Sequence, residues 1–197
     1  MARKCGGRTD KVATIDEGTA LIIIDVQEGL DDPKLGRRNN PMAEKNMARL
    51  LQRWRALGRP VFHVQHMSTE PHSPLRPELP GNAIKRVVAP IGNEPVIQKQ
   101  VNSAFIGTDL EQRLRAAGIN ALVIVGLTTD HCISSSVRMA GDLGFNAVVI
   151  ADATAAHEHR STDGRHYSAE LVHTLALASL HGEFAAVLTT DEVLDAE

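Results

Sequence analysis

The chain has 197 residues, 43% of them apolar, and a formal net charge of −3. This length fits one domain with its own core, and the weakly acidic charge excludes the basic excess of nucleic-acid binding, so no nucleic-acid partner is expected. The sequence contains neither a signal-peptide core in its first twenty residues nor the run of about 18 apolar residues that spans a membrane. We therefore expect a cytoplasmic protein without a membrane partner. Its two cysteines, Cys5 and Cys132, give no disulfide framework.

Six short apolar segments rich in β-branched residues recur along the chain. Continuous apolar runs of this kind are typical of strands that are buried on both faces of a parallel sheet. The segments cover 20–26, 60–66, 95–99, 121–126, 146–152 and 184–190. They predict a mainly parallel sheet with helices on its faces.

Helical spacing of apolar residues appears between these strands. The predicted helices cover 43–58, 108–118, 132–144 and 168–182. Gly58 and Gly118 are placed to end the first two helices. Thr108 and Glu111 form a capping box that predicts Thr108 as the N-cap of the second helix.

Strands that alternate with helices predict an α/β fold, a three-layer αβα sandwich. We interpret 1–17 as an N-terminal tail and 18–197 as one domain. The exception to the alternation is the proline-rich segment 67–94, which is too long for a routine connection. Because the strand pattern resumes after it, we expect a functional loop or lid.

The segment VIVGLTTDHCISSS (123–136) leads from a predicted strand through Cys132 into a predicted helix. Open parallel sheets bind ligands outside the carboxyl ends of their strands, beside helix N-termini. Backbone N–H groups and the helix dipole favour negative charge there, so we expect a lowered pKa for the Cys132 thiol and donors for an oxyanion. The alternative is a small buried hydrophobic cysteine.

Two other strand ends carry charged side chains. Asp25 ends the run at 20–26, where a buried carboxylate needs a partner or a proton; the alternative is a helix N-cap. Lys99 ends the run at 95–99, where the alternative is a solvated surface charge. An acid, an amine and a thiol at strand ends are the parts of an activated nucleophile, so the combination favours a catalytic site.

Four motifs give the chain a family resemblance. They are ALIIIDVQ (20–27), VIQKQVNSAFIGTDLEQRLRAAGI (96–119), VIVGLTTDHCISSSVRMAGDLGF (123–145) and VVIADAT (148–154). In order and spacing they resemble the isochorismatase-like cysteine hydrolase superfamily, which includes nicotinamidases and N-carbamoylsarcosine amidohydrolase. The resemblance extends from about residue 18 to the C-terminus.

The resemblance implies a catalytic triad of Asp25, Lys99 and Cys132. It also implies a six-stranded, mainly parallel sheet of order 3-2-1-4-5-6. A cis peptide bond between Leu127 and Thr128 is a further implication, with the N–H groups of Thr128 and Cys132 forming the oxyanion hole.

The resemblance also suggests pocket residues. Gln27 and Phe105 resemble positions that line the family's substrate pocket, although Phe105 fits the hydrophobic core equally well. His131 stands beside Cys132, so it also belongs to the candidate pocket. Packing or a hydrogen bond at the start of the helix is the alternative for His131.

Nicotinamidases of this superfamily bind a metal through an Asp-x-His pattern and further histidines after the second strand. Here the region reads HVQHMSTEPHSP (63–74), which contains His63, His66 and His72 but no Asp-x-His. His63 and His66 have an odd spacing on a predicted strand and therefore point to opposite faces. We predict no metal or other cofactor, with zinc as the disfavoured alternative.

The presence of Cys132 favours hydrolysis of a C–N bond in a small amide, ureido compound, lactam or cyclic imide through a thioester. Isochorismatases of the same superfamily, which cleave a vinyl ether and typically lack this cysteine, give one alternative. A catalytically silent binding module closed by 67–94 gives another, and a redox sensor a third. The resemblance further implies a homo-oligomer that acts on a small-molecule substrate.

Overall fold

A computed structural model describes residues 15–195, so Cys5 and most of the predicted tail lie outside the described residues. Its main sheet has six parallel strands in the order β3-β2-β1-β4-β5-β8. These strands are β1 (Ala20–Ile24), β2 (Val61–His66), β3 (Val96–Lys99), β4 (Ala121–Leu127), β5 (Asn146–Ala155) and β8 (Ala185–Leu188). The predicted order is confirmed, because β8 is the sixth strand of this sheet along the chain. The short strands β6 (His159–Arg160) and β7 (His166–Tyr167) form a separate antiparallel hairpin.

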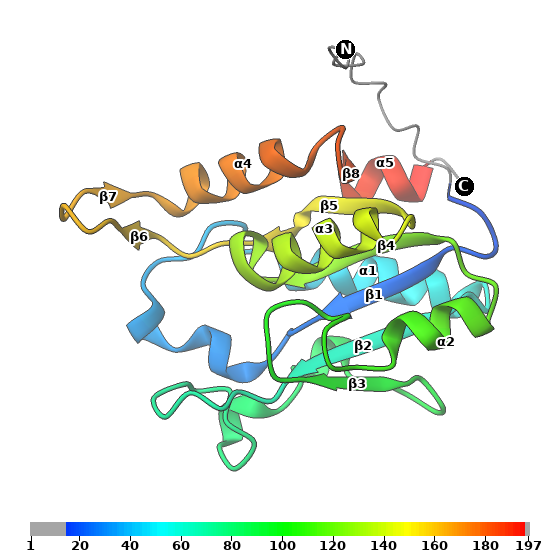
Figure 1. The fold of residues 1–197 in the computed structure, drawn as a ribbon, viewed down its shortest axis with the longest axis horizontal. Helices are drawn as coiled ribbons and strands as arrows, with labels where there is room; N and C mark the ends of the chain where they lie inside the picture. The colour runs from blue at the N-terminus through cyan, green and yellow to red at the C-terminus, as the bar shows by residue number, and fades with distance from the viewer. Residues whose placement is uncertain (1–14, 196–197) are drawn as a thin grey trace, which may run out of the picture.

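Helices cover both faces of the sheet, as Figure 1 shows. They are α1 (Ala43–Ala56), α2 (Leu110–Ala116), α3 (Ser134–Asp142), α4 (Ala169–Leu180) and α5 (Thr190–Asp195). One buried cluster joins the sheet to α1 and α5, and a second joins it to α2, α3 and α4. The predicted three-layer α/β architecture is therefore confirmed.

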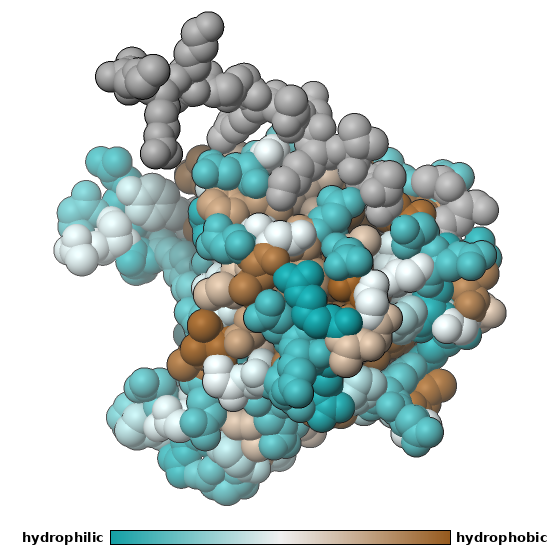
Figure 2. All heavy atoms as spheres, turned by 45° about the vertical axis from the view of Figure 1, so that its right-hand side comes forward, coloured by the Kyte–Doolittle hydropathy of each residue, from teal (hydrophilic) through white to brown (hydrophobic). Residues whose placement is uncertain are grey.

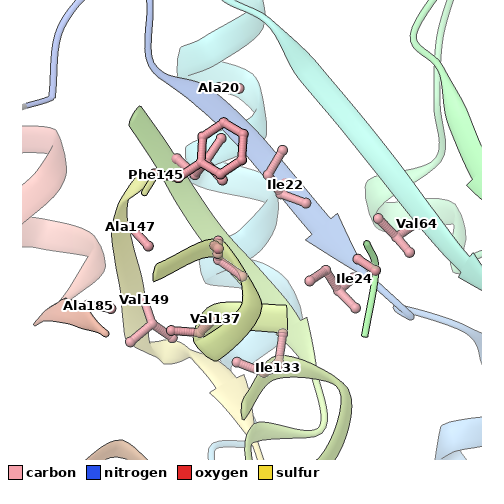
Figure 3. Close-up of a cluster of buried hydrophobic side chains, with 14 of the residues drawn as sticks. Ala20, Ile22, Ile24, Val64, Ile133, Val137, Phe145, Ala147, Val149 and Ala185 are labelled. Atoms are coloured by element: carbon pink, nitrogen blue, oxygen red, sulfur yellow. The ribbon is translucent and has the colours of Figure 1, made fainter. Parts of the chain in front are cut away.

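Strand β1 contributes side chains to both hydrophobic clusters. Ile22 and Ile24 pack in the cluster that contains Val137 of α3 (Figure 3), whereas Leu21 lies in the opposite cluster with Trp54 of α1. Side chains of a strand alternate between faces, so a continuous apolar run supplies both clusters. Each of these side chains contributes about 1.5–3 kcal/mol through burial, which holds the end of β1 in a fixed position.

Three details differ from the sequence-based expectations. Helix α2 begins at Leu110 with Asp109 as its N-cap, so the predicted N-cap at Thr108 is wrong. The Thr108 hydroxyl donates to the Ala104 carbonyl at 2.6 Å and accepts from the Leu110 N–H at 3.4 Å. Strand β3 is an edge strand with alternating exposed and buried residues, and the short helix α5 follows β8 without having been predicted.

The described surface is predominantly hydrophilic on the side drawn in Figure 2, with hydrophobic side chains scattered over it. Such a distribution is ordinary for a surface that faces water. Within residues 15–195, no helix combines the length and the apolar content that crossing a bilayer requires.

An ionic network fixes the segment 67–94 to the body of the domain. This segment contains two short 3-10 helices, η3 (Pro80–Asn82) and η4 (Arg86–Val88). Just before η4, the Lys85 ammonium donates to Asp31 at 2.6 Å and to Glu44 of α1 at 2.7 Å. Arg38 donates to both oxygens of the Glu44 carboxylate. The segment is therefore anchored at Lys85 rather than free along its whole length.

Replacing Glu44 by glutamine should lower the free energy of unfolding by about 2–3 kcal/mol at pH 7. Burial raises the pKa of Glu44, but hydrogen bonds from Arg38 and Lys85 outweigh burial and lower the pKa to about 2. A carboxyl with a lowered folded-state pKa stabilises the protein above its unfolded pKa, and this contribution is lost as the pH falls toward 2. Urea denaturation of wild type and Glu44→Gln should therefore show a difference that shrinks between pH 5 and pH 2.

The exposed Glu17 provides a matched control for this experiment. Glu17→Gln should unfold like the wild type across the same pH range. A Glu44→Gln penalty that stays constant down to pH 2 would contradict the network described above.

Candidate active site

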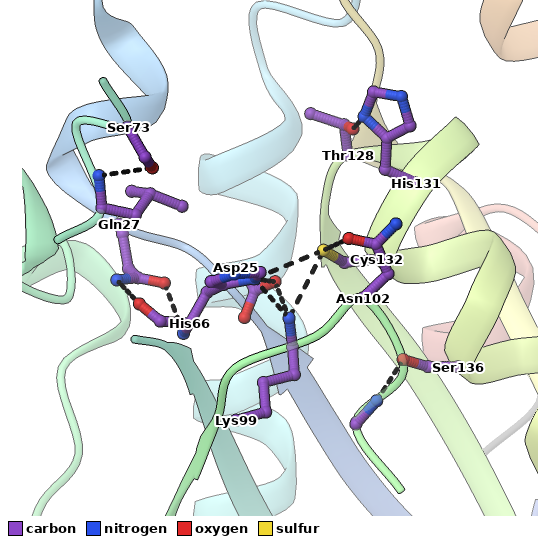
Figure 4. Close-up of polar contacts among 12 residues, drawn as sticks. Asp25, Gln27, His66, Ser73, Lys99, Asn102, Thr128, His131, Cys132 and Ser136 are labelled. Carbon is purple, nitrogen blue, oxygen red and sulfur yellow. Dashed lines mark hydrogen bonds and ion pairs between the residues drawn. The ribbon is translucent and has the colours of Figure 1, made fainter. Parts of the chain in front are cut away.

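The structure brings Asp25, Lys99 and Cys132 together at the carboxyl edge of the sheet (Figure 4). The Lys99 ammonium lies 2.6 Å from Oδ2 of Asp25 and 3.4 Å from Sγ of Cys132. A carboxylate oxygen of Asp25 lies within 4.8 Å of the Cys132 sulfur. Asp25 and Lys99 are each only 1% exposed, so neither is a solvated surface charge.

Asp25 leaves β1 with an unusual backbone conformation. Its φ of 53° lies in the left-handed region, which non-glycine residues seldom adopt. Its N–H donates to the Val64 carbonyl at 2.9 Å, so the backbone continues the pairing with β2 while the side chain faces Lys99. Oδ1 of Asp25 is buried and has no hydrogen-bond partner among the described residues. That oxygen is available to accept a proton.

A close approach of β1 and β4 places Cys132 next to Asp25. Gly126 of β4 has a φ of 130°, and a Cβ atom there would lie 2.0 Å from the Ile24 carbonyl oxygen. Only glycine fits this position, because any side chain would push the two strands apart. From Leu127 the chain enters a π-helical turn, η5 (Thr129–Ile133), which carries Cys132 and leads directly into α3.

The electrostatic environment of Cys132 differs from the one expected from the sequence. Burial raises the pKa of the thiol, and the adjacent Asp25 carboxylate raises it further, while Lys99 acts in the opposite direction. The predicted lowering of this pKa is therefore wrong, because desolvation and a neighbouring negative charge outweigh the ammonium and the helix terminus. The protein environment therefore favours the thiol form of Cys132, which lies next to the Asp25 side chain.

The Leu127–Thr128 peptide bond is cis, in agreement with the family resemblance. Thr128 and Cys132 both line a cavity of about 540 Å³. The cavity also receives side chains from the segment 67–94, namely Ser68, Thr69, Glu70, Ser73 and Leu75. This segment therefore forms a wall of the cavity and leaves Cys132 accessible to a small molecule.

The three predicted pocket residues have different positions. His131 lines the cavity. Among the described residues, Gln27 and Phe105 are not part of its lining. The buried Gln27 side chain is hydrogen-bonded to the backbone of His66 and to the Asn82 carbonyl. Phe105 stacks against Phe145 with ring centroids 5.8 Å apart, so it belongs to the hydrophobic core.

Two residues at the site were not predicted as catalytic or pocket residues. Nδ1 of His66 lies 2.8 Å from the Lys99 ammonium and 3.8 Å from the Cys132 sulfur. Asn102 lines the cavity with its Oδ1 3.8 Å from the same sulfur. His63 and His66 have an odd spacing on β2, so their side chains point to opposite faces of the sheet. This spacing was the sequence signal that only one of the two histidines could lie beside Lys99.

The three histidines that were considered as metal ligands have different surroundings: His63 and His66 belong to β2, and His72 follows it. His63 faces away from the cavity and its Nε2 lies 2.9 Å from a carboxylate oxygen of Glu94, whereas His66 contacts the Lys99 ammonium. His72 is exposed, and the three rings do not converge in the described structure. The expected separation of His63 and His66 is thus observed.

Two other groups of side chains have the composition of a metal site. Asp25, His66 and Cys132 have ligand atoms within 4.8 Å of one another, but the Lys99 cation already lies among them. Asp130, His131 and His159 form the second group at the cavity wall. Nε2 of His159 lies 2.6 Å from Oδ2 of Asp130, whereas Oδ1 of Asp130 is buried and has no hydrogen-bond partner among the described residues. Burial raises the pKa of Asp130, but the His159 hydrogen bond and the charges of His131 and His159 together lower it below its ordinary value.

Comparisons with known proteins agree with this fold. The Isochorismatase domain model matches residues 19–192. The chain is 48% identical over 181 residues to the uncharacterised isochorismatase family protein YrdC of Bacillus subtilis, over 92% of this chain and 97% of that protein. An isochorismatase-family crystal structure from Chromobacterium violaceum is 44% identical with a TM-score of 0.90, over 94% of this chain and 96% of that one.

A maleamate amidohydrolase of Pseudomonas putida is 30% identical over 149 residues, which are 68% of this chain and 70% of that protein. The family model alone spans nearly the whole described chain, and its residues 19–192 include every strand of the main sheet. The chain therefore belongs to the isochorismatase family of hydrolases, within the isochorismatase-like cysteine hydrolase superfamily.

Proposed function

We propose that this hydrolase cleaves a C–N bond of a small amide, ureido compound, lactam or cyclic imide through a thioester on Cys132. One observation supports this most directly. A buried carboxylate with an unpartnered oxygen lies beside the Cys132 thiol, and the Lys99 ammonium contacts both groups at the edge of an open cavity. This arrangement supplies a nucleophile, a base and a fixed positive charge.

In the first half of the reaction, Asp25 accepts the thiol proton as the sulfur attacks the substrate carbonyl carbon. A C–S bond forms, and the carbonyl electron pair moves to oxygen. When the tetrahedral intermediate collapses, the C–N bond breaks and the protonated Asp25 returns its proton to the leaving nitrogen. From an acyclic substrate ammonia or an amine departs, whereas the nitrogen of a lactam or cyclic imide stays attached to the opened acyl chain. In both cases an acyl thioester remains on Cys132, with Asp25 again ionised.

In the second half, water attacks the thioester carbonyl and gives a proton to Asp25. Collapse of the second tetrahedral intermediate breaks the C–S bond. The departing sulfur takes the proton back from Asp25, and the acid product leaves. Lys99 stays charged throughout and stabilises the negative charge that passes between the carboxylate and the sulfur.

We assign oxyanion stabilisation to the backbone N–H groups of Thr128 and Cys132. Both residues line the cavity beside the nucleophile. A preorganised donor of this kind contributes about 2.7–4 kcal/mol to transition-state stabilisation. The scheme uses no metal or organic cofactor, because the three side chains and two backbone donors carry every charge and proton.

Two observations favour a C–N bond over a vinyl ether as the bond that is cleaved, namely the Cys132 nucleophile and the similarity to a maleamate amidohydrolase. A thiolate attacks acyl carbon, whereas vinyl ether cleavage has no step that uses Cys132. The maleamate amidohydrolase bears a name that describes hydrolysis of an amide. The cavity of about 540 Å³ fits a small molecule.

A screen of small primary amides, ureido compounds, lactams and cyclic imides tests this proposal, with release of ammonia or amine as the readout for acyclic substrates and mass spectrometry of ring opening for the lactams and imides. We expect turnover of at least one of these classes by the wild type. Isochorismate should give no pyruvate, and pyruvate release would instead assign the vinyl ether reaction. A protein that binds members of the panel but turns over none would be a silent binding module.

A further inference from the structure

His66 is the fourth side chain in contact with the catalytic centre (Figure 4). Its Nδ1 atom lies 2.8 Å from the Lys99 ammonium, 3.7 Å from Asp25 Oδ2 and 3.8 Å from Cys132 Sγ. His66 and Lys99 are paired residues at the ends of β2 and β3. This contact therefore follows from the register of the sheet rather than from the conformation of a loop.

The backbone of His66 is held from both sides. Its N–H donates to Gln27 Oε1 at 2.8 Å, and its carbonyl accepts from Gln27 Nε2 at 3.0 Å and from Asn82 Nδ2 at 2.8 Å. Gln27 is fully buried, and Asn82 belongs to the segment that walls the cavity. Gln27 thus acts on the site by fixing His66, although it does not line the cavity itself.

The contact with Lys99 fixes the tautomer of the His66 ring. An ammonium group has only donors, so the Nδ1 atom that faces it must carry the lone pair. The hydrogen of the neutral ring then resides on Nε2. His66 lines the cavity, and its Nε2 atom is not one that is both buried and unpartnered. In the described structure no residue accepts a hydrogen bond from Nε2, so this N–H is presented to the cavity.

The His66 ring lies 3.7 Å from Oδ2 of Asp25, the group that protonates the leaving nitrogen in the proposed reaction. We propose that His66 is a substrate-binding residue whose Nε2–H donates to an oxygen acceptor on this side of the scissile bond. The inference rests on the proposed C–N hydrolysis and narrows its substrate class. A second carbonyl oxygen, as in a cyclic imide or an acylurea, supplies such an acceptor, whereas a simple lactam does not. Through Nδ1 the same ring holds the Lys99 ammonium between Asp25 and Cys132.

Two substitutions separate the two nitrogens of the ring. Asparagine places an amide oxygen near the position of Nδ1, and glutamine places an amide N–H near the position of Nε2. We would measure kcat and KM of wild type, His66→Asn and His66→Gln with succinimide and with 2-pyrrolidinone. These rings differ by one carbonyl, and the intrinsic difference in their reactivity cancels when variants are compared with the wild type.

The preference for succinimide should fall about 10-fold or more in His66→Asn and should be largely retained in His66→Gln. His72→Asn, at an exposed histidine of the neighbouring segment, should leave the preference unchanged. Equal losses for the two substrates in His66→Asn, with the preference intact, would overturn the assignment of Nε2. Thermal unfolding of each variant shows whether a loss comes from misfolding.

A second measurement does not depend on turnover. Nitrogen-15 NMR of the histidine rings at pH 8, with His66 assigned by its absence in His66→Asn, should show a neutral ring protonated at Nε2. In Lys99→Met this tautomer preference should weaken. A ring protonated at Nδ1 would overturn the inference even if the enzyme hydrolyses amides. If the ring is protonated at Nε2 but the protein hydrolyses no compound of the panel, the proposed C–N hydrolysis is wrong and the tautomer assignment of His66 stands.

Discussion

Replacement of Cys132 by alanine is expected to lower kcat for C–N hydrolysis at least about 10³-fold. The substitution removes the atom that forms the thioester, and no described serine or threonine hydroxyl contacts Lys99 and could replace it. The side chain is small and 8% exposed, so its loss should leave the fold intact. Steady-state release of ammonia or amine by purified wild type and variant measures the effect.

The second cysteine of the chain gives the matched control. Cys5→Ala should retain wild-type turnover, because the family model matches residues 19–192 and Cys5 lies before them. Cys132→Ser tests the chemistry further, since a hydroxyl is a weaker nucleophile beside the same base. Near wild-type turnover in Cys132→Ala would place the chemistry on other residues.

Replacement of Asp25 by asparagine should also lower kcat at least about 10³-fold, while making the thiol more reactive toward a simple alkylating agent. An amide has nearly the same shape as the carboxylate and tolerates the left-handed backbone of this position, but it cannot accept the thiol proton. Burial and the Asp25 charge raise the pKa of Cys132. Removing that charge leaves Lys99 to favour the thiolate, so iodoacetamide should modify Cys132 faster at pH 8 than in the wild type.

Slower turnover together with faster alkylation in Asp25→Asn would identify Asp25 as the base, because a carboxylate with only a structural role predicts no such combination. Asp25→Asn should cost about 3 kcal/mol of stability, because Lys99 loses its ionic partner, and thermal unfolding checks that the variant stays folded. Asp142→Asn, at an exposed position of α3, should change neither turnover nor alkylation. Slower alkylation together with slower turnover would indicate a damaged site and would contradict the role of Asp25 as base.

Much of the arrangement is readable from the sequence because strand ends are local features. The apolar run before Asp25 and the one before Gly126 each predict a buried parallel strand. Parallel strands bring their carboxyl ends to one edge, which is where Asp25, Lys99 and Cys132 are found. The capping-box pattern at Thr108 predicted a helix correctly but placed its start too early, since the hydroxyl is used by the preceding turn.

Other features depend on contacts between distant segments and could not be read from the sequence. The pKa of Cys132 is set by burial and by a charge more than a hundred residues away in sequence, which a local helix-terminus argument omits. Gln27 was expected in the pocket by resemblance, but its amide pairs with the backbone of β2 instead. His66 was considered only as a metal ligand, and its role follows from the pairing of β2 with β3.

Mass spectrometry of the protein quenched within the first turnovers tests the central claim most directly. With a substrate found in the screen, the wild type should carry an acyl group, and digestion should locate it as a thioester on the peptide that contains Cys132. Asp25→Asn should accumulate little of this adduct, and Cys132→Ala none. Rapid turnover with an unmodified Cys132 peptide at every time point, or an acyl group on another residue, would contradict the mechanism.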